Sequence, residues 1–411
     1  APHSETLLTM AAIPRYRPIA GPALFSAGFR PFFLAAALWA VVAVPIWLMA
    51  YATGIAPPSV LPPIIWHAHE MIFGFATAVV AGFLLTAIPN WTGEMPLQGW
   101  PLAMLVSLWL IGRIAVLLSA EIGSLVAALA DLSFPAVFIA AVAREIVAGR
   151  NWRNLPMLAA LSLLAIANLL VHLDALGLAG TAALGNRIGI GTLLMLIALM
   201  GGRLVPSFTR NWLVKNRPDV VPPARAGTFD LVALVVTGLG LAAWIFAPDT
   251  PIASWAELAA GIAAGLRLSH WRGARVAREP LVLILHIGYG WLAFGLLCLG
   301  LNGFFQFLPQ TTALHALTVG SIGTMTLAVM TRASLSHTGL PSSAGPATKV
   351  IYLLITSAAV LRLVAPLTGA QTMLTLSLAG AAWCASFGLF VLFYGGPLTH
   401  PRVNDGGGKA I

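Results

Sequence analysis

Residues 31–53 read PFFLAAALWAVVAVPIWLMAYAT and contain no charged side chain. An α-helix needs about 20 mainly apolar residues to cross the hydrocarbon core of a bilayer. Stretches of the same kind recur along the chain, separated by proline, glycine and clusters of charge. We find twelve, at 31–53, 63–88, 100–119, 123–147, 155–176, 183–201, 228–247, 251–266, 281–303, 311–334, 348–368 and 372–396. The pattern predicts an all-α polytopic membrane protein.

The composition excludes a water-soluble domain. Charged residues make up 9% of the 411 residues and hydrophobic residues 59%, whereas an average soluble domain is about 25% charged. So few polar side chains cannot cover the surface of a soluble protein, and a chain this hydrophobic does not stay disordered. Cys298 and Cys384 lie inside apolar runs, which argues against a disulfide framework or a cysteine-rich metal site.

The basic residues predict the orientation of the spans. Almost all of them fall in alternate connections, whereas the connections on the other side hold only Arg187. Loops rich in Lys and Arg stay on the cytoplasmic side, so both termini are predicted to be cytoplasmic. The expected divisions are a cytoplasmic N-terminal segment at 1–30, a twelve-helix transmembrane domain at 31–396 and a cytoplasmic tail at 397–411. This distribution explains the net charge of +9 without nucleic acid as a partner.

An internal repeat is not evident in the sequence. Many transporters consist of two six-helix repeats. Here the second and tenth spans share only an opening His-Ala, at His67 and at His315. We therefore expect no repeat.

The second span opens with WHAHEM at 66–71, on the predicted outer side. Ionisable side chains are costly in hydrocarbon, so those that persist there usually have a partner or a task. His67 and Glu70 share one helix face, and His69 lies about 200° around the helix from His67. One metal ion cannot readily bind both histidines of an unbroken helix, but two neighbouring centres could, one on each flank. In the alternative interpretation, the rings form hydrogen bonds with carbonyl groups or lipid headgroups.

Two more histidines belong to the same side of the membrane. His315 opens the tenth span, and His172 ends the fifth, where it could also lie at the interface. Imidazoles that converge in one leaflet are a suitable ligand set for haem or copper, with carboxylates orienting them, and Met71 could join a Cu(I) site. Arg113, near mid-membrane in the third span, is expected either to line an ion route or to form a buried pair with Asp131 of the fourth.

A second pair of histidines lies on the predicted inner side. His286 is near the start of the ninth span, and His337 follows the tenth. Arg203 and Arg332 lie at a similar depth, and arginine suits the propionates of a haem. The neighbouring glycines would let a macrocycle approach the backbone, although close helix packing explains them equally well. Without a Cys-x-x-Cys-His motif, any haem would be a non-covalent haem b.

Several of these segments resemble the NnrS family of bacterial membrane proteins, and the resemblance extends over nearly the whole chain. The stretches that carry it are WHAHEM at 66–71, GFLLTAIPNWTG at 82–93, GGR at 201–203 with Pro206, FTRN at 208–211, His286 with Gly288-Tyr289, HALTVG at 315–320, MTR at 330–332 and HTG at 337–339. The chain departs from the family pattern on either side of His337-Thr338-Gly339. It has Ser336 and Leu340 where Gly and Arg are expected.

The resemblance implies a haem- and copper-containing protein of the bacterial inner membrane, linked to denitrification and to tolerance of nitrosative stress. On this basis we expect the chain to bind nitric oxide and to reduce it as an oxidoreductase, with membrane quinol as the electron source. His67, His69 and His315 would hold the reactive metal, and Glu70 would relay protons. His286 and His337 would hold an electron-transfer haem.

Two other functions stay open. In the first, the chain is a transporter or a metal- or haem-handling protein that binds its cargo through the same histidines. In the second, it is a sensor or scaffold that binds nitric oxide without turnover. Tight haem with a spectral response to nitric oxide favours the reductase, whereas exchangeable metal and counter-flow in liposomes favour the transporter.

Overall fold

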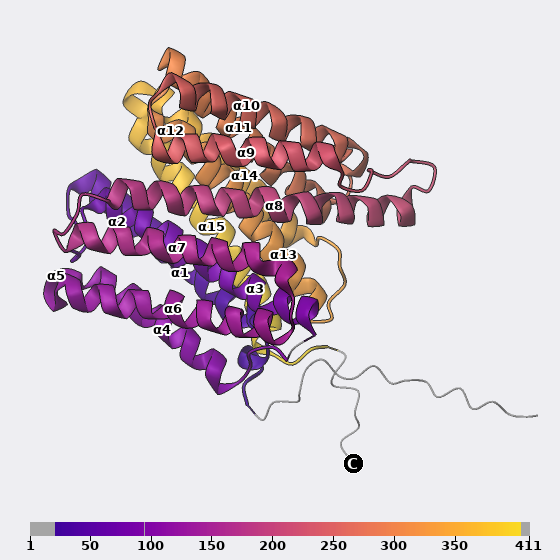
Figure 1. The fold of residues 1–411 in the computed structure, drawn as a ribbon, viewed down its shortest axis with the longest axis horizontal. Helices are drawn as coiled ribbons and strands as arrows, with labels where there is room; N and C mark the ends of the chain where they lie inside the picture. Colours follow the sequence, from indigo (N-terminus) through magenta and orange to yellow (C-terminus); the bar gives the residue numbers. More distant parts are fainter. Residues whose placement is uncertain (1–20, 94, 404–411) are drawn as a thin grey trace, which may run out of the picture.

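A computed structural model describes residues 21–93 and 95–403, and this part of the chain is helical with no strand. Its long helices run roughly parallel to one another, and α8 lies between α7 and α9 (Figure 1). The helices of the first half are α1 (Phe29–Thr53), α2 (Pro63–His69), α3 (Thr77–Thr92), α4 (Trp100–Leu117), α5 (Ser119–Ile122), α6 (Ser124–Ala148), α7 (Leu155–Ala175) and α8 (Ala182–Asn216). Those of the second half are α9 (Thr228–Phe246), α10 (Pro251–His270), α11 (Pro280–Phe305), α12 (Gln310–His315), α13 (Thr324–His337), α14 (Pro346–Val364) and α15 (Thr372–Thr399).

Two of the spans contain a π-helix. The π-helix η2 (Glu70–Ala76) joins α2 to α3, and η5 (Ala316–Gly323) joins α12 to α13. Each span is therefore one continuous rod that changes its winding directly after a histidine. Such local π-helices are found frequently at functional sites.

Eleven helices in the described residues are long and apolar enough to cross a membrane. This finding confirms the predicted all-α polytopic fold. The predicted span at 251–266 lies within α10, which is long enough but carries Glu257 and Arg267 and is therefore less apolar. Despite these charges, α10 lies within the bundle, where it packs between α9 and α11. Arg267 Nε donates to Asp230 Oδ1 of α9 at 3.1 Å.

The helices pack in a pattern that repeats every four spans. The first unit comprises α1, the α2–α3 rod, α4 and α6; the second comprises α7 to α10; the third comprises α11, the α12–α13 rod, α14 and α15. In each unit the first span packs on the second and the third on the fourth. The fourth span of each unit then packs on the first of the next, and α15 closes the ring on α1.

The second spans of the three units meet inside this ring. The helix α8 contacts both η2 and η5, and α13 contacts α3. The second spans of the first and third units also correspond in the positions of particular residues. His69 and His315 each precede a π-helix, and Gly93 and Gly339 follow the two rods with φ of 81° and 80°. The chain thus has a repeat of four helices rather than of six, in which His69, not His67, corresponds to His315.

The two ends of the bundle meet on one side. Arg30 Nη1, near the start of α1, donates to the carbonyl oxygens of Pro397, Leu398 and His400 at 3.2, 3.1 and 2.7 Å. This contact agrees with an even number of crossings. Residues 1–20 and 404–411, which hold most of the two predicted cytoplasmic end segments, lie outside the described residues, so their location stays a prediction.

Candidate functional site

A cluster of polar side chains lies inside the bundle, where α2, η2, α4, α6 and α7 meet. We call it the polar cluster; its members are His69, Glu70, Arg113, Asp131, Asn168 and His172. Each of them is at most 3% exposed. Burying ionisable groups at membrane depth is costly unless each has a partner, so the contacts among these groups decide what the cluster can do.

Arg113 connects the two carboxylates of the polar cluster. Its Nη1 donates to Glu70 Oε1 and Oε2 at 2.9 and 2.8 Å, and its Nη2 donates to Asp131 Oδ1. The predicted buried pair of Arg113 and Asp131 is therefore confirmed. One guanidinium here faces two carboxylates, so these three groups together leave one negative charge uncompensated.

The imidazole of His69 lies between acceptors. Its Nδ1 is 2.9 Å from Glu70 Oε1, and its Nε2 is 2.8 Å from Asn168 Oδ1. The amide of Asn168 must be oriented in this way, because its Nδ2 donates to Asp131 Oδ2 at 2.8 Å. A ring with protons on both nitrogens satisfies both acceptors and neutralises the remaining negative charge. The space around His69 Nε2 therefore suits a positive charge, either a proton or a metal ion.

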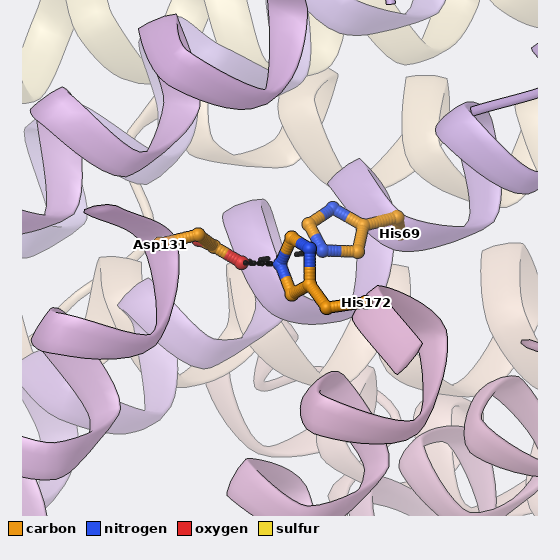
Figure 2. A group of neighbouring side chains, drawn as sticks. All are labelled: His69, Asp131 and His172. Atoms are coloured by element: carbon orange, nitrogen blue, oxygen red, sulfur yellow. Dashed lines mark hydrogen bonds and ion pairs between the residues drawn. The ribbon is translucent and has the colours of Figure 1, made fainter. Parts of the chain in front are cut away.

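His172 completes a group that could hold a metal ion. Its Nε2 is 2.9 Å from Asp131 Oδ2, and Asp131 Oδ2 is 3.3 Å from His69 Nε2. One ligand atom from each of the three residues lies within 4.8 Å of the others. Figure 2 shows the three side chains pointing toward one another from separate helices. Two imidazoles and a carboxylate suit copper, zinc or iron, and Asn168 and Glu70 are placed to orient them.

His67 lies on the opposite flank of the same helix, away from the polar cluster. Its ring stacks on Trp47 of α1, with 4.9 Å between centroids and 17° between planes, and its Nδ1 is buried with no hydrogen-bond partner. His315 Nδ1 is 2.5 Å from the carbonyl oxygen of Thr311. Of the four predicted outer histidines, the structure thus brings His69 and His172 together and separates His67 from them.

The predicted inner histidines have separate neighbours. His286 Nδ1 is 3.1 Å from the carbonyl oxygen of Val282, and its Nε2 is 3.3 Å from Thr209 Oγ1. The ring of His337 packs on that of Phe29, with 5.3 Å between centroids. No contact between His286 and His337 is found in the described part of the chain.

Arg203 and Arg332, which the sequence places at the same depth as His286 and His337, have separate surroundings as well. The Arg332 guanidinium is 3.6 Å from the centroid of the Phe208 ring, and Arg203 is exposed on α8. The inner haem site therefore stays a prediction, without contacts that bring its residues together.

Asn168 is the member of the polar cluster that sequence reasoning missed. It lies in an apolar run of α7, four residues before His172, and so on the same helix face. An amide one turn from a membrane histidine could have been recognised by that spacing. Its partners could not, because they come from α2 and α6.

The comparison with protein families agrees with the sequence resemblance. The family model described as NnrS protein matches residues 23–402. The chain belongs to the NnrS family. No curated protein matches it. Membership of the NnrS family indicates a membrane protein of the nitric oxide response, in a family associated with haem and metal binding.

The donor set of His69, Asp131 and His172 could hold a metal ion. A small hollow next to the polar cluster is lined by Phe73, Phe134 and other mainly apolar residues together with Asp131 and Asn168.

A larger cavity lies where the central spans meet. Its volume is about 100 Å³, and it lies between α3, α7, α8, α11, η5 and α13. Met157, Met200 and Met325 are among its lining residues, and no histidine is. An iron ligand of the imidazole type is therefore not available in this cavity, whose lining is mainly apolar.

Proposed function

We propose that this NnrS protein binds nitric oxide at a metal centre inside the membrane and reduces it, and so protects the cell from nitrosative stress. The observation that carries the proposal is the group of His69, Asp131 and His172, buried together at membrane depth. Nitric oxide is small and weakly polar, so it enters the bilayer in which such a site lies. The protein would act in the bacterial inner membrane.

The reaction that fits is reductive coupling. Two nitric oxide molecules, two electrons and two protons give one nitrous oxide and one water; an N–N bond forms and one N–O bond breaks. Oxidation of one membrane quinol to quinone supplies the two electrons and releases two protons. Copper, with haem b as a further group, supplies one-electron chemistry when bound.

The side chains of the polar cluster have distinct tasks in this proposal. His69, His172 and Asp131 hold the metal. Arg113 keeps the Glu70 carboxylate 2.9 Å from His69 Nδ1, so a proton can pass between Glu70 and this ring. This proposal keeps Glu70 as the proton-relay residue.

Removal of one ligand tests the proposal. His172→Phe keeps a planar ring of similar size but removes the donor nitrogen, and His270→Phe changes an exposed histidine as a matched control. We expect purified His172→Phe protein to lose its copper and to lose nitrous oxide formation with a reduced quinol by about 10- to 100-fold, the usual cost of disturbing a metal site. Copper binding and turnover equal to those of His270→Phe would overturn the proposal.

A second function is favoured by the cavity between the central spans. This cavity of about 100 Å³ is lined by apolar side chains, which suits a transporter with a small apolar cargo. Liposome counter-flow of haem or copper, unaffected by His172→Phe, would support this function over the reductase.

A further inference from the structure

The cavity between the central spans has almost no polar group that could hold water. Its lining consists of methionine, aliphatic and aromatic side chains, and among the described residues at its wall only Thr326 has an oxygen or nitrogen atom in its side chain. The Thr326 hydroxyl already donates to the carbonyl oxygen of Gly323 at 2.8 Å. A buried water needs about two to four polar partners, so we expect this cavity to be dry.

The volume of the cavity limits what can occupy it. At about 100 Å³, it is smaller than an engineered apolar cavity of about 150 Å³ that stays dry and binds xenon or benzene. A space of this size holds a xenon atom or a diatomic gas, whereas a haem or a membrane quinol is too large for it.

The walls of the cavity come from all three four-helix units. Val80 of α3 belongs to the first unit, Met200 of α8 to the second and Val329 of α13 to the third. The wall is closely packed at Gly201, where an added Cβ atom would lie 3.3 Å from Met325 Cε. The cavity is therefore a product of the way the three units meet, and not of one irregular helix.

One face of α7 runs from the cavity to the polar cluster. Met157, Leu161, Leu164, Asn168 and His172 follow one another at intervals of three or four residues and so share this face. Each of them is at most 3% exposed. Met157 lines the cavity, the next three line the small hollow, and the last two belong to the polar cluster. At the rise of an α-helix, Met157 and Asn168 are about 16 Å apart along α7.

The rod of η2 and α3 borders the same two spaces. Phe73 and Thr77 line the small hollow, whereas Ala76 and Val80 line the cavity. A molecule in the cavity thus lies about three helix turns from the polar cluster, and the α7 side chains between them, Leu161 and Leu164, are apolar.

We propose that this cavity binds one molecule of a small apolar gas, nitric oxide in the cell, and so forms a second site that holds substrate without a metal. The binding of a gas follows from the volume and the lining of the cavity. That this gas is the substrate on its way to the polar cluster rests on the proposed function.

Xenon is the probe for the cavity, because it is apolar, small and visible by its anomalous X-ray scattering. Crystals of the full chain pressurised with xenon are expected to show a xenon atom between Met157, Met200 and Val329. Ordered water in the cavity, a lipid or detergent chain that fills it, or xenon bound only elsewhere would overturn the proposal.

Cavity-filling variants test the position of the site. Val80→Phe and Val329→Phe each place a larger side chain in the cavity and should remove the xenon density. Val360→Phe makes the same change on α14, where the side chain is 46% exposed, and should leave the density unchanged. Xenon that stays bound in both filled variants contradicts the proposal.

Another variant covers the case in which the filled proteins do not fold. Met157→Ala removes most of a lining side chain and enlarges the cavity. At the same pressure it should bind more xenon than wild type. Density equal to that of wild type would count against the assigned place.

The supply of substrate has a kinetic readout of its own. Val80→Phe should raise the KM for nitric oxide more than it lowers kcat, because it changes access to the polar cluster and not the residues that hold the metal. Val360→Phe should change neither constant. A KM for Val80→Phe equal to that of wild type would show that the cavity does not supply the polar cluster.

The two proposals fail in distinguishable ways. If wild-type crystals take up no xenon in the cavity while His172→Phe loses its activity, the gas site is wrong and the polar cluster keeps its function. If His172→Phe stays fully active while xenon binds in the cavity, the gas site holds and the metal site of the polar cluster is wrong.

Discussion

At the scale of single residues, Arg113 is the side chain on which the polar cluster depends. It is 1% exposed and donates to both Glu70 and Asp131. Removing one member of a buried ion pair costs more than the pair contributes, because the remaining charge is left without compensation. The same guanidinium also fixes the carboxylates that hold His69 and His172, so its loss affects the proposed metal site indirectly.

We expect Arg113→Gln to lower the free energy of unfolding in detergent by about 3–5 kcal/mol, the range for breaking a buried ion pair. Thermal or denaturant unfolding followed by circular dichroism measures this change. Arg217→Gln is the control, because Arg217 and its partner Asp219 are exposed and such pairs contribute little. A melting temperature for Arg113→Gln equal to that of Arg217→Gln would show that the carboxylates do not need this arginine.

At the scale of elements, the π-helix η2 brings a glycine against the polar cluster. A Cβ atom added at Gly74 would lie 2.8 Å from Trp39 Nε1, 2.9 Å from Glu70 Oε2 and 3.0 Å from Arg113 Nη1. Trp109 Nε1 also donates to the carbonyl oxygen of Gly74 at 3.0 Å. The backbone of η2 is therefore packed so closely to α1 and α4 that a side chain at this position must displace the cluster.

Gly74→Ala is expected to destabilise the protein by about 1–3 kcal/mol, as overpacking usually does, and to reduce copper binding. Gly388→Ala in α15 is the matched control, since a Cβ there meets nothing within 4 Å. This control should be neutral or slightly stabilising, because alanine is the better helix former by about 1 kcal/mol. Equal melting temperatures and equal copper contents for the two variants would contradict the role given to η2.

At the scale of the whole molecule, the four-helix units form a closed ring. The ring closes where α15 packs on α1 and where Arg30 binds the carbonyl groups at the end of α15. Because Arg30 meets residues 397–400 at this closure, the start of α1 and the end of α15 lie on the same side of the bundle. The distribution of Lys and Arg predicts that this side is the cytoplasm.

Reporter fusions check the predicted orientation. Green fluorescent protein fused after residue 411 should fluoresce, and alkaline phosphatase inserted in the connection at 176–181, between α7 and α8, should be active, because this enzyme folds only outside the cytoplasm. Phosphatase activity at the C-terminus together with inactivity at 176–181 would reverse the orientation.

Much of the fold could be predicted because the signal is local. Residues 31–53 or 281–303 are apolar over a full span whatever surrounds them, so spans can be read from runs of residues. The placement of His67 and His69 on opposite flanks of one helix could also be predicted from local sequence, because it follows from helix periodicity. The span at 251–266 was harder to recognise, since α10 carries Glu257 and Arg267, and the partner of Arg267, Asp230, lies on another helix.

The sequence by itself determined an all-helical membrane protein, its spans, their predicted direction and the placement of two histidines on opposite flanks of one helix. Only the tertiary structure decided that Asp131, Asn168 and His172 join His69, that His67 stacks on Trp47, and that four-helix units repeat around a ring. The physical reason is that hydropathy and helix periodicity act along the chain within a few turns. Contacts between distant helices depend on how whole surfaces pack, and no short stretch of residues encodes that packing.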